Sequence, residues 1–152
     1  MKSVIFVLLA ALIFLPASVF ADEPGDEILG VWHTTDDKSQ VQIFRVKNQY
    51  FGRIISLKEP NWPANDELGM GGKPKTDRRN PNHELRNRPI VGMQFMGDFV
   101  PLGKNLWESG VIYDPEAGKT YKCKLTLISP NRLKVRGYVG FTLLGRTEVW
   151  TR

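Results

Sequence analysis

Short runs of alternating apolar and polar residues fill most of the chain after residue 27. Because successive side chains of a β-strand point to opposite faces, this two-residue period indicates strands, and little of the chain shows a helical period. The alternation is clearest over residues 120–128, where the apolar positions are Tyr121, Cys123, Leu125 and Leu127. One face of each strand is therefore expected to form a core or line a cavity, while the other lies in water.

Eight such runs are predicted, and most of them are joined by short turns. They span residues 28–34, 40–47, 50–58, 89–96, 106–113, 120–128, 133–139 and 145–151. Residues 97–104 are interpreted as a loop, and residues 141–144 as a short apolar link. Eight consecutive strands favour a single antiparallel up-and-down barrel, whose interior is just filled by side chains or holds one small ligand. A two-sheet β-sandwich fits the same periodicity and is the alternative.

The first 21 residues have the pattern of a signal peptide. Lys2 precedes an apolar run over residues 4–15. Val19 and Ala21 then occupy the two positions that a signal peptidase reads, so cleavage is expected after Ala21. The mature chain, 22–152, would have 131 residues and form a single domain. A transmembrane anchor needs about 20 apolar residues, and the run over residues 4–15 is shorter, so it is interpreted as part of a signal peptide. The mature chain is expected to lack a transmembrane segment.

The cysteine content and the lack of glycosylation signals indicate a bacterial compartment. Cys123 is the only cysteine, so no disulfide can form within the chain, and no Asn-X-Ser/Thr acceptor occurs. A domain of this size buries enough surface to be stable without disulfides. We therefore expect export to the bacterial periplasm.

The charge of the chain is only a weak guide to its binding partners. The chain has 21 Lys and Arg against 16 Asp and Glu, and its basic residues are interpreted as scattered, apart from a group between Lys73 and Arg88. Nucleic-acid binding needs basic residues gathered on one face, so a nucleic-acid partner is not expected. The group itself is interpreted as a solvated loop, with weak attraction to anionic envelope surfaces as the alternative.

Two tryptophan motifs bracket the expected domain. Gly30-Val31-Trp32 lies in the first predicted strand, and Trp150-Thr151-Arg152 ends the last one. A closed barrel pairs its first and last strands and so leaves no edge. We therefore expect the two motifs to lie near one seam.

Across residues 30–152 the sequence resembles a family of exported bacterial proteins known only as domain-of-unknown-function family 2147. The matching segments follow one another over nearly the whole expected domain. They are Gly30-Val-Trp, Gly52-Arg-Ile, Gly72-Lys-Pro-Lys-Thr-Asp77, Arg88-Pro-Ile-Val-Gly92, Tyr113-Asp-Pro-Glu-Ala-Gly-Lys-Thr-Tyr121, Leu133-Lys-Val-Arg-Gly137 and Gly145-Arg-Thr-Glu-Val-Trp-Thr-Arg152. The resemblance implies a small exported β domain and brings no established activity or catalytic residue.

The bracket also resembles the calycin superfamily, which includes lipocalins and fatty-acid-binding proteins. In those barrels a Gly-X-Trp tryptophan closes one end, and an arginine from the end of the last strand packs across it. The resemblance assigns Gly30 and Trp32 to a closed end, with Arg146 and Arg152 both candidates for the closing arginine. A glycine allows close backbone approach, and a guanidinium stacks well on an indole face. The opposite mouth is then the expected place for function.

No residue set identifies a metal or catalytic site. His33 and His83 have no regular ligand spacing and no second cysteine exists, so no metal or other cofactor is expected. The Gly-X-Ser-X-Gly elbow of hydrolases is missing. Cys123 lies among apolar residues and is interpreted as a buried, unreactive thiol.

A long insertion over residues 59–88 is the segment most typical of a functional loop. It is rich in Pro, Gly, Asn and charge, and loops longer than about 15 residues are usually functional or disordered. Its candidate ligand-binding residues are Trp62, Lys75 and Asp77. The favoured interpretation is a structural strap over an open barrel end, with Trp62 packed down, and a grip on a ligand's anionic head is the alternative.

Arg53 is a further candidate, because it is predicted to share a face with Phe51, Ile55 and Leu57. If that face is inward, a buried guanidinium needs a carboxylate partner or a ligand anion. Fatty-acid-binding barrels hold a carboxylate with inward Arg and Tyr, and this resemblance assigns Tyr113 and Tyr121 to act with Arg53. An internal salt bridge is the alternative.

Three functional hypotheses follow. The first is a non-enzymatic exported barrel that binds a small amphipathic or apolar ligand, which predicts an interior cavity of at least about 300 Å³. The second is an envelope structural or protein-interaction module with a solid core and an exposed aromatic patch near Trp62. An enzyme is the least favoured hypothesis, because it requires Arg53, Lys75 or Asp77 to converge in a cleft.

Overall fold

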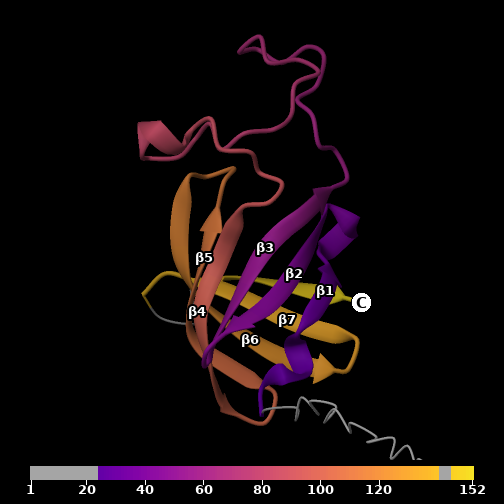
Figure 1. Cartoon of the computed structure of the whole chain (residues 1–152), viewed down its shortest axis with the longest axis vertical. Coiled ribbons are helices and arrows are strands. Elements are labelled where there is room, and N and C mark those ends of the chain that lie inside the picture. The colour runs from indigo at the N-terminus through magenta and orange to yellow at the C-terminus, as the bar shows by residue number, and fades with distance from the viewer. Residues whose placement is uncertain (1–23, 141–144) are drawn as a thin grey trace, which may run out of the picture.

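Eight antiparallel strands follow one another in chain order and close into a barrel (Figure 1). The structure, a computed structural model, describes residues 24–140 and 145–152, so the predicted signal peptide and the predicted link at 141–144 lie outside the described residues. The strands are β1 (Gly30–His33), β2 (Ser39–Val46), β3 (Gln49–Leu57), β4 (Gln94–Gly103), β5 (Leu106–Asp114), β6 (Lys119–Ser129), β7 (Arg132–Tyr138) and β8 (Gly145–Thr151). The predicted up-and-down barrel is confirmed, and the sandwich alternative is wrong.

Helical structure is limited to three short 3₁₀ turns within the described part of the chain. They are η1 (Asp26–Ile28), η2 (Thr35–Asp37) and η3 (His83–Leu85). None of the helical segments in residues 24–140 and 145–152 has the length and apolarity needed to cross a membrane.

The fourth strand lies later in the chain than the sequence predicts. The predicted strand over residues 89–96 is mostly irregular, and β4 instead runs through residues 97–103, which were predicted as a loop. Asp98 and Pro101 are the breakers that suggested the loop. Asp98 has a positive φ of 63° at an irregularity of the strand, and Pro101 lies beyond the last β3 pair at Phe99, where β5 alone needs hydrogen bonds.

The inward face of β3 also differs from the prediction. Tyr50 and Ile54 are buried inside the barrel, so Phe51 and Arg53 point outward. A register shift against β2 then changes the alternation, and Leu57 returns to the interior. The predicted common face of Phe51, Arg53 and Leu57 is therefore wrong.

The barrel end nearest η1 is closed and packed. Ile28 of η1 is fully buried, the Trp107 indole N–H donates to the Gly25 carbonyl at 3.2 Å, and the Tyr50 hydroxyl donates to Asp26 Oδ1 at 2.9 Å. Burial and this hydrogen bond raise the pKa of Tyr50. The rest of the buried cluster consists of Trp32, Val41, Ile43, Met96, Phe99, Cys123, Leu125, Leu127, Leu133, Val135 and Trp150.

The tryptophan bracket lies at this closed end. Trp32 is fully buried, and its indole N–H donates to the Ile28 carbonyl at 2.8 Å. The guanidinium carbon of Arg152 lies 4.3 Å from the centroid of the Trp32 ring. The nitrogens of Arg152 also donate to three carbonyl oxygens, those of Glu27 at 3.0 Å, Leu29 at 2.9 Å and Pro130 at 2.8 Å.

The bracket strengthens a seam that has few backbone bonds. Strands β1 and β8 are paired at His33 and Thr151 alone, whereas the other neighbouring strands share longer ladders. Arg152 ties both sides of this seam to the loop before β7. Arg146, the other candidate, lies at the opposite rim, where it pairs with Glu148 at 3.0 Å.

We expect the Arg152→Ala and Arg146→Ala variants to differ in their free energy of unfolding. Loss of Arg152 should lower the free energy of unfolding by about 2 kcal/mol, because three hydrogen bonds from a charged donor and an indole contact disappear. Loss of Arg146 removes a surface pair and should cost less than about 0.5 kcal/mol. Urea unfolding measures both values, and equal losses would contradict the assignment of the seam to Arg152.

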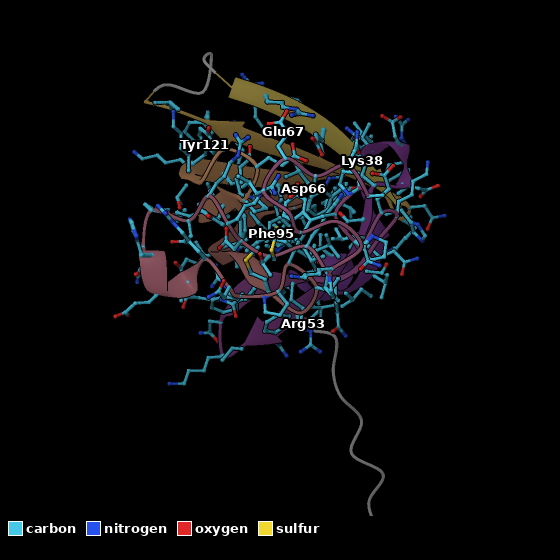
Figure 2. All side chains as sticks on the ribbon, turned by 90° about the horizontal axis from the view of Figure 1, so that it is seen from above. Lys38, Arg53, Asp66, Glu67, Phe95 and Tyr121 are labelled. Atoms are coloured by element: carbon cyan, nitrogen blue, oxygen red, sulfur yellow. The ribbon has the colours of Figure 1, made fainter. Side chains whose placement is uncertain are left out.

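The insertion crosses the other end of the barrel. It leaves the end of β3, extends above the strands and returns to the start of β4 (Figure 1). Seen from above, it passes over the barrel opening (Figure 2). We call residues 58–93 the strap.

Candidate ligand cavity

A cavity of about 1280 Å³ occupies the open half of the barrel, away from the Trp32 bracket. Its lining includes Phe95, which packs on the closed-end core, and Trp150, which belongs to that core; their ring centroids are 6.3 Å apart. The barrel interior is therefore solid only in its closed half. The volume exceeds the minimum of about 300 Å³ that the ligand-binding hypothesis requires.

Apolar side chains form the walls of this cavity. The wall residues shared among the strands and the strap are Ile54, Leu57, Ile90, Phe95, Ile112, Val135 and Trp150. Gly137 of β7 also faces the cavity, and a Cβ placed there would meet Ile112 Cγ2 at an ordinary contact distance of 3.5 Å. The glycine thus leaves room that a larger residue would occupy.

Charged side chains surround the mouth. The basic rim residues are Lys38, Lys58, Lys75, Arg78, Arg79 and Arg146, and the acidic ones are Asp36, Glu59, Asp114, Glu116 and Glu148. The two signs are nearly balanced, so the rim has no strong preference for one charge. An apolar wall below a polar, charged rim suits an amphipathic molecule better than a purely polar one.

Trp62 covers part of the mouth from the strap. It is partly buried, and the Arg78 guanidinium carbon lies 3.5 Å from its ring centroid, while Lys75 Nζ lies 5.8 Å from the same centroid. Arg78 is held by Asp66, whose Oδ1 accepts a hydrogen bond from Arg78 Nη1 at 2.7 Å. This contact with Arg78 holds the pKa of Asp66 below its usual value. The indole N–H of Trp62 is buried and has no hydrogen-bond partner among the residues that the structure describes.

A buried carboxylate fastens the strap to the barrel. Asp77 is fully buried and accepts hydrogen bonds from the Tyr113 hydroxyl at 2.6 Å, Arg88 Nη2 at 2.7 Å and Asn80 Nδ2 at 2.7 Å. Tyr113 belongs to β5, so this cluster joins strap and wall. Burial, followed by the hydrogen bond to Asp77, raises the pKa of Tyr113 to about 12.

Backbone contacts support the same attachment. Ile54 of β3 donates its backbone N–H to the carbonyl of Met93 in the strap at 3.0 Å, and its own carbonyl accepts from the N–H of Gly92 at 2.7 Å. A Cβ on Gly118, in the turn between β5 and β6, would collide with the Arg79 carbonyl oxygen, so glycine lets that turn approach the strap. The strap is thus a bonded part of the wall.

The predicted site residues divide into three groups. Trp62, Lys75, Tyr113 and Tyr121 all line the cavity. Asp77 does not line it and acts through its contacts with Tyr113 and Arg88. Inward placement of Arg53 is wrong, as its side chain is exposed and donates to Gln42 Oε1 at 2.9 Å, near the barrel edge in Figure 2.

The residues named for an enzyme do not converge. Arg53 lies on the outer wall, Lys75 at the rim and Asp77 inside the strap attachment. Burial raises the pKa of the Cys123 thiol to about 12, which suppresses its reactive thiolate. Within residues 24–140 and 145–152, no three His, Cys, Asp or Glu side chains gather as metal ligands.

Sequence reasoning missed several cavity residues. Phe95 was assigned to a misplaced strand, the rim residues Lys38 and Lys58 were assigned no role, and Arg79 was assigned to a solvated basic loop. Gly137 carried a usable signal, because a glycine at an inward position of a strand often marks space for another group.

Comparison with known proteins identifies the family. Residues 30–152 match the family described as "Uncharacterized protein conserved in bacteria (DUF2147)". The chain belongs to this family. The match covers every strand of the barrel and confirms the resemblance read from the sequence segments.

A solved structure supports the wider relationship. The chain resembles protein HP1028 from the human pathogen Helicobacter pylori, which is described as belonging to the lipocalin family, with 27% sequence identity and a TM-score of 0.68. The similarity covers 82% of this chain and 81% of that one. No curated protein matched the chain. The calycin-like resemblance is thereby confirmed at the level of fold.

Proposed function

We propose that this protein is an exported, non-enzymatic barrel that binds a small amphipathic or apolar molecule in the bacterial cell envelope. The observation that carries the proposal is the cavity of about 1280 Å³, with apolar walls beneath a charged rim. Burial of apolar surface supplies most of the affinity in such a site, and rim groups orient the polar end of the ligand.

The arrangement of the two barrel ends supports this function. The closed end is filled by the Trp32 cluster, so the described residues leave the mouth beside the strap as the entrance for a ligand. Tyr113 is held by Asp77, whereas Tyr121 lines the cavity and has no hydrogen bond through its hydroxyl among the described residues. Tyr121 is the side chain best placed to meet a ligand's polar group in the interior.

The export part of the proposal rests on the N-terminal sequence pattern. We expect the protein to accumulate in the periplasmic fraction with Asp22 as its first residue, since the pattern directs cleavage after Ala21. N-terminal sequencing of the fractionated protein measures this. Retention of the full chain in the cytoplasm would contradict export and leave the cavity proposal standing.

Binding is tested with Gly137→Val. The added methyl groups project into the cavity from a position whose Cβ has room, so affinity should fall at least about ten-fold while the fold is retained. Titration with the neutral fluorophore N-phenyl-1-naphthylamine measures the affinity. Native mass spectrometry of protein purified from its own host shows in parallel whether a small molecule co-purifies.

The matched control is Thr126→Val, which places the same side chain on an outward position of β6. It should leave binding of the fluorophore unchanged. The proposal fails if the wild-type protein binds neither the fluorophore nor a co-purifying molecule, or if Gly137→Val binds the fluorophore as the wild type does.

A further inference from the structure

The outer wall formed by β6 and β7 gathers basic side chains on one face. Cys123, Leu125, Leu133 and Val135 of these strands are buried, so the residues between and beside them point outward. The outward basic residues are Lys122 and Lys124 on β6 and Arg132, Lys134 and Arg136 on β7. We call these five residues the basic wall. The expectation that basic residues are scattered outside the strap is therefore wrong.

Strand register brings these charges close together. Lys124 is directly opposite Arg136, and like charges at directly opposed positions destabilise a sheet. No carboxylate of β6 or β7 offsets this pair. Glu148 of the adjacent β8 lines the cavity instead, and Glu108 of β5 makes no ion pair with Lys124.

Most of the wall cations have no ionic partner within the described part of the chain. Lys122, Lys124, Arg132 and Lys134 form no ion pair there, and Arg136 donates to the Thr147 hydroxyl at 2.7 Å. The charges of Lys122, Lys124, Arg132 and Lys134 are therefore available to a partner.

The charge distribution of the whole chain has the same asymmetry. Residues 117–147 contain seven Lys and Arg and no Asp or Glu. Because the chain's formal charge is +5, all other residues together carry −2. The net positive charge of the protein thus belongs to the strands that form the basic wall. Solubility alone does not require the positive charges to gather in one part of the surface.

Aliphatic side chains lie beside the cations. Ile128, on the outward face at the end of β6, is 48% exposed, and Val111 of β5, which is paired with Lys122, is 37% exposed. A surface that combines basic residues with exposed aliphatic ones suits the interface of an anionic bilayer, where the aliphatic groups enter the headgroup boundary. Lysine stems add apolar surface around each ammonium group.

We propose that the basic wall docks this protein on a membrane surface rich in anionic phospholipids. The alternative of a nucleic-acid strand is less well supported, because such proteins stack bases on exposed aromatic rings. Among the described residues, the outward positions of β6 and β7 carry one aromatic ring, that of Tyr138, which is partly buried at the end of β7 opposite Lys122 and also lines the cavity. The wall is on the side of the barrel, so docking leaves the mouth of the cavity uncovered.

Co-sedimentation with lipid vesicles tests the proposal. The protein is purified from its own host, so that its N-terminus is the one the host produces. Vesicles of phosphatidylcholine with about 30% phosphatidylglycerol should bind it, and vesicles of phosphatidylcholine alone should not. Binding should weaken between about 10 mM and about 150 mM salt, as the screening length falls from about 30 Å to about 8 Å.

The variant Lys122→Gln/Lys124→Gln should reduce the partition constant by about 25-fold, at about five-fold for each basic residue removed near an anionic surface. The matched control Lys73→Gln/Lys104→Gln removes two exposed lysines outside the wall and should change it less than about three-fold. A second wall variant, Arg132→Gln/Lys134→Gln, should behave like the first, so that one poorly folding variant does not decide the result.

Several outcomes overturn the proposal. They are an absence of binding to the anionic vesicles, equal binding to both kinds of vesicle, an equal loss in the control variant, and wall-dependent binding of a single-stranded oligonucleotide without vesicle binding. Gly137→Val should still bind the anionic vesicles, because lipid docking does not use the cavity. Loss of vesicle binding in Gly137→Val would show that lipid enters the barrel instead.

Discussion

Replacement of Trp32 by alanine should destabilise the protein more than any other single change considered, by about 4 kcal/mol. Trp32 is fully buried at the closed end, and its removal leaves a cavity below the Arg152 guanidinium. The Ile28 carbonyl would also lose its hydrogen bond from the indole. Domains of this kind have total stabilities of about 5–15 kcal/mol, so the loss should be visible as a large shift in the urea midpoint.

The matched comparison for this variant is Trp62→Ala. The same side chain is removed, but Trp62 is only partly buried, on the strap, between cations. It should cost about 1 kcal/mol or less, because the strap can rearrange around the space. If Trp62→Ala destabilises the protein as much as Trp32→Ala does, the core at the closed end is not the main source of stability.

Replacement of Asp77 by alanine should release the strap. The change leaves Arg88 and the Tyr113 hydroxyl without their acceptor, and breaking a buried ion pair usually costs about 3–5 kcal/mol. Arg88 is 36% exposed and can turn toward water, so we expect a smaller loss of about 2–3 kcal/mol. Unfolding in urea measures the loss.

Local release is measured separately by limited proteolysis. Trypsin should cut the Asp77→Ala variant at the strap's lysines and arginines well before the barrel strands, because local opening exposes the strap backbone. Glu116→Ala is the control, since it removes an exposed carboxylate at the same end of the barrel. Tyr113→Phe should cost about 1 kcal/mol by removing one hydrogen bond. Unchanged proteolysis of Asp77→Ala would contradict its role as the strap's attachment.

The strand pattern predicted the fold where the sequence alternates without interruption. Over β6 the apolar positions Cys123, Leu125 and Leu127 are the buried ones, because burial of one face enforces the period. The prediction failed at β4, because Asp98 and Pro101 are residues that usually interrupt a strand. β4 accommodates Asp98 at an irregularity in its pairing with β3, and Pro101 beyond the last residue paired with β3. It also failed at β3, where an irregularity in pairing with β2 changes which side chains face inward.

The candidate site was predicted less completely for a related reason. Trp62, Lys75, Tyr113 and Tyr121 line the cavity as candidates, yet their convergence depends on the path of the strap. The sequence of the strap has no period, so nothing in it indicates which residues turn toward the barrel. Asp77 was identified as a ligand contact, and only its buried partners show that it fastens the strap.

The sequence by itself determined the class of this protein: a small all-β chain with an eight-strand rhythm, a tryptophan bracket and one long insertion. These features are local, because periodicity and turn residues act between near neighbours in the chain. Tertiary structure alone decided that Arg152 covers Trp32, that the strap crosses the open end of a barrel with a cavity in one half, and that five cations form the basic wall. Each of these depends on strand register and chain path, which bring together residues that are far apart in the sequence.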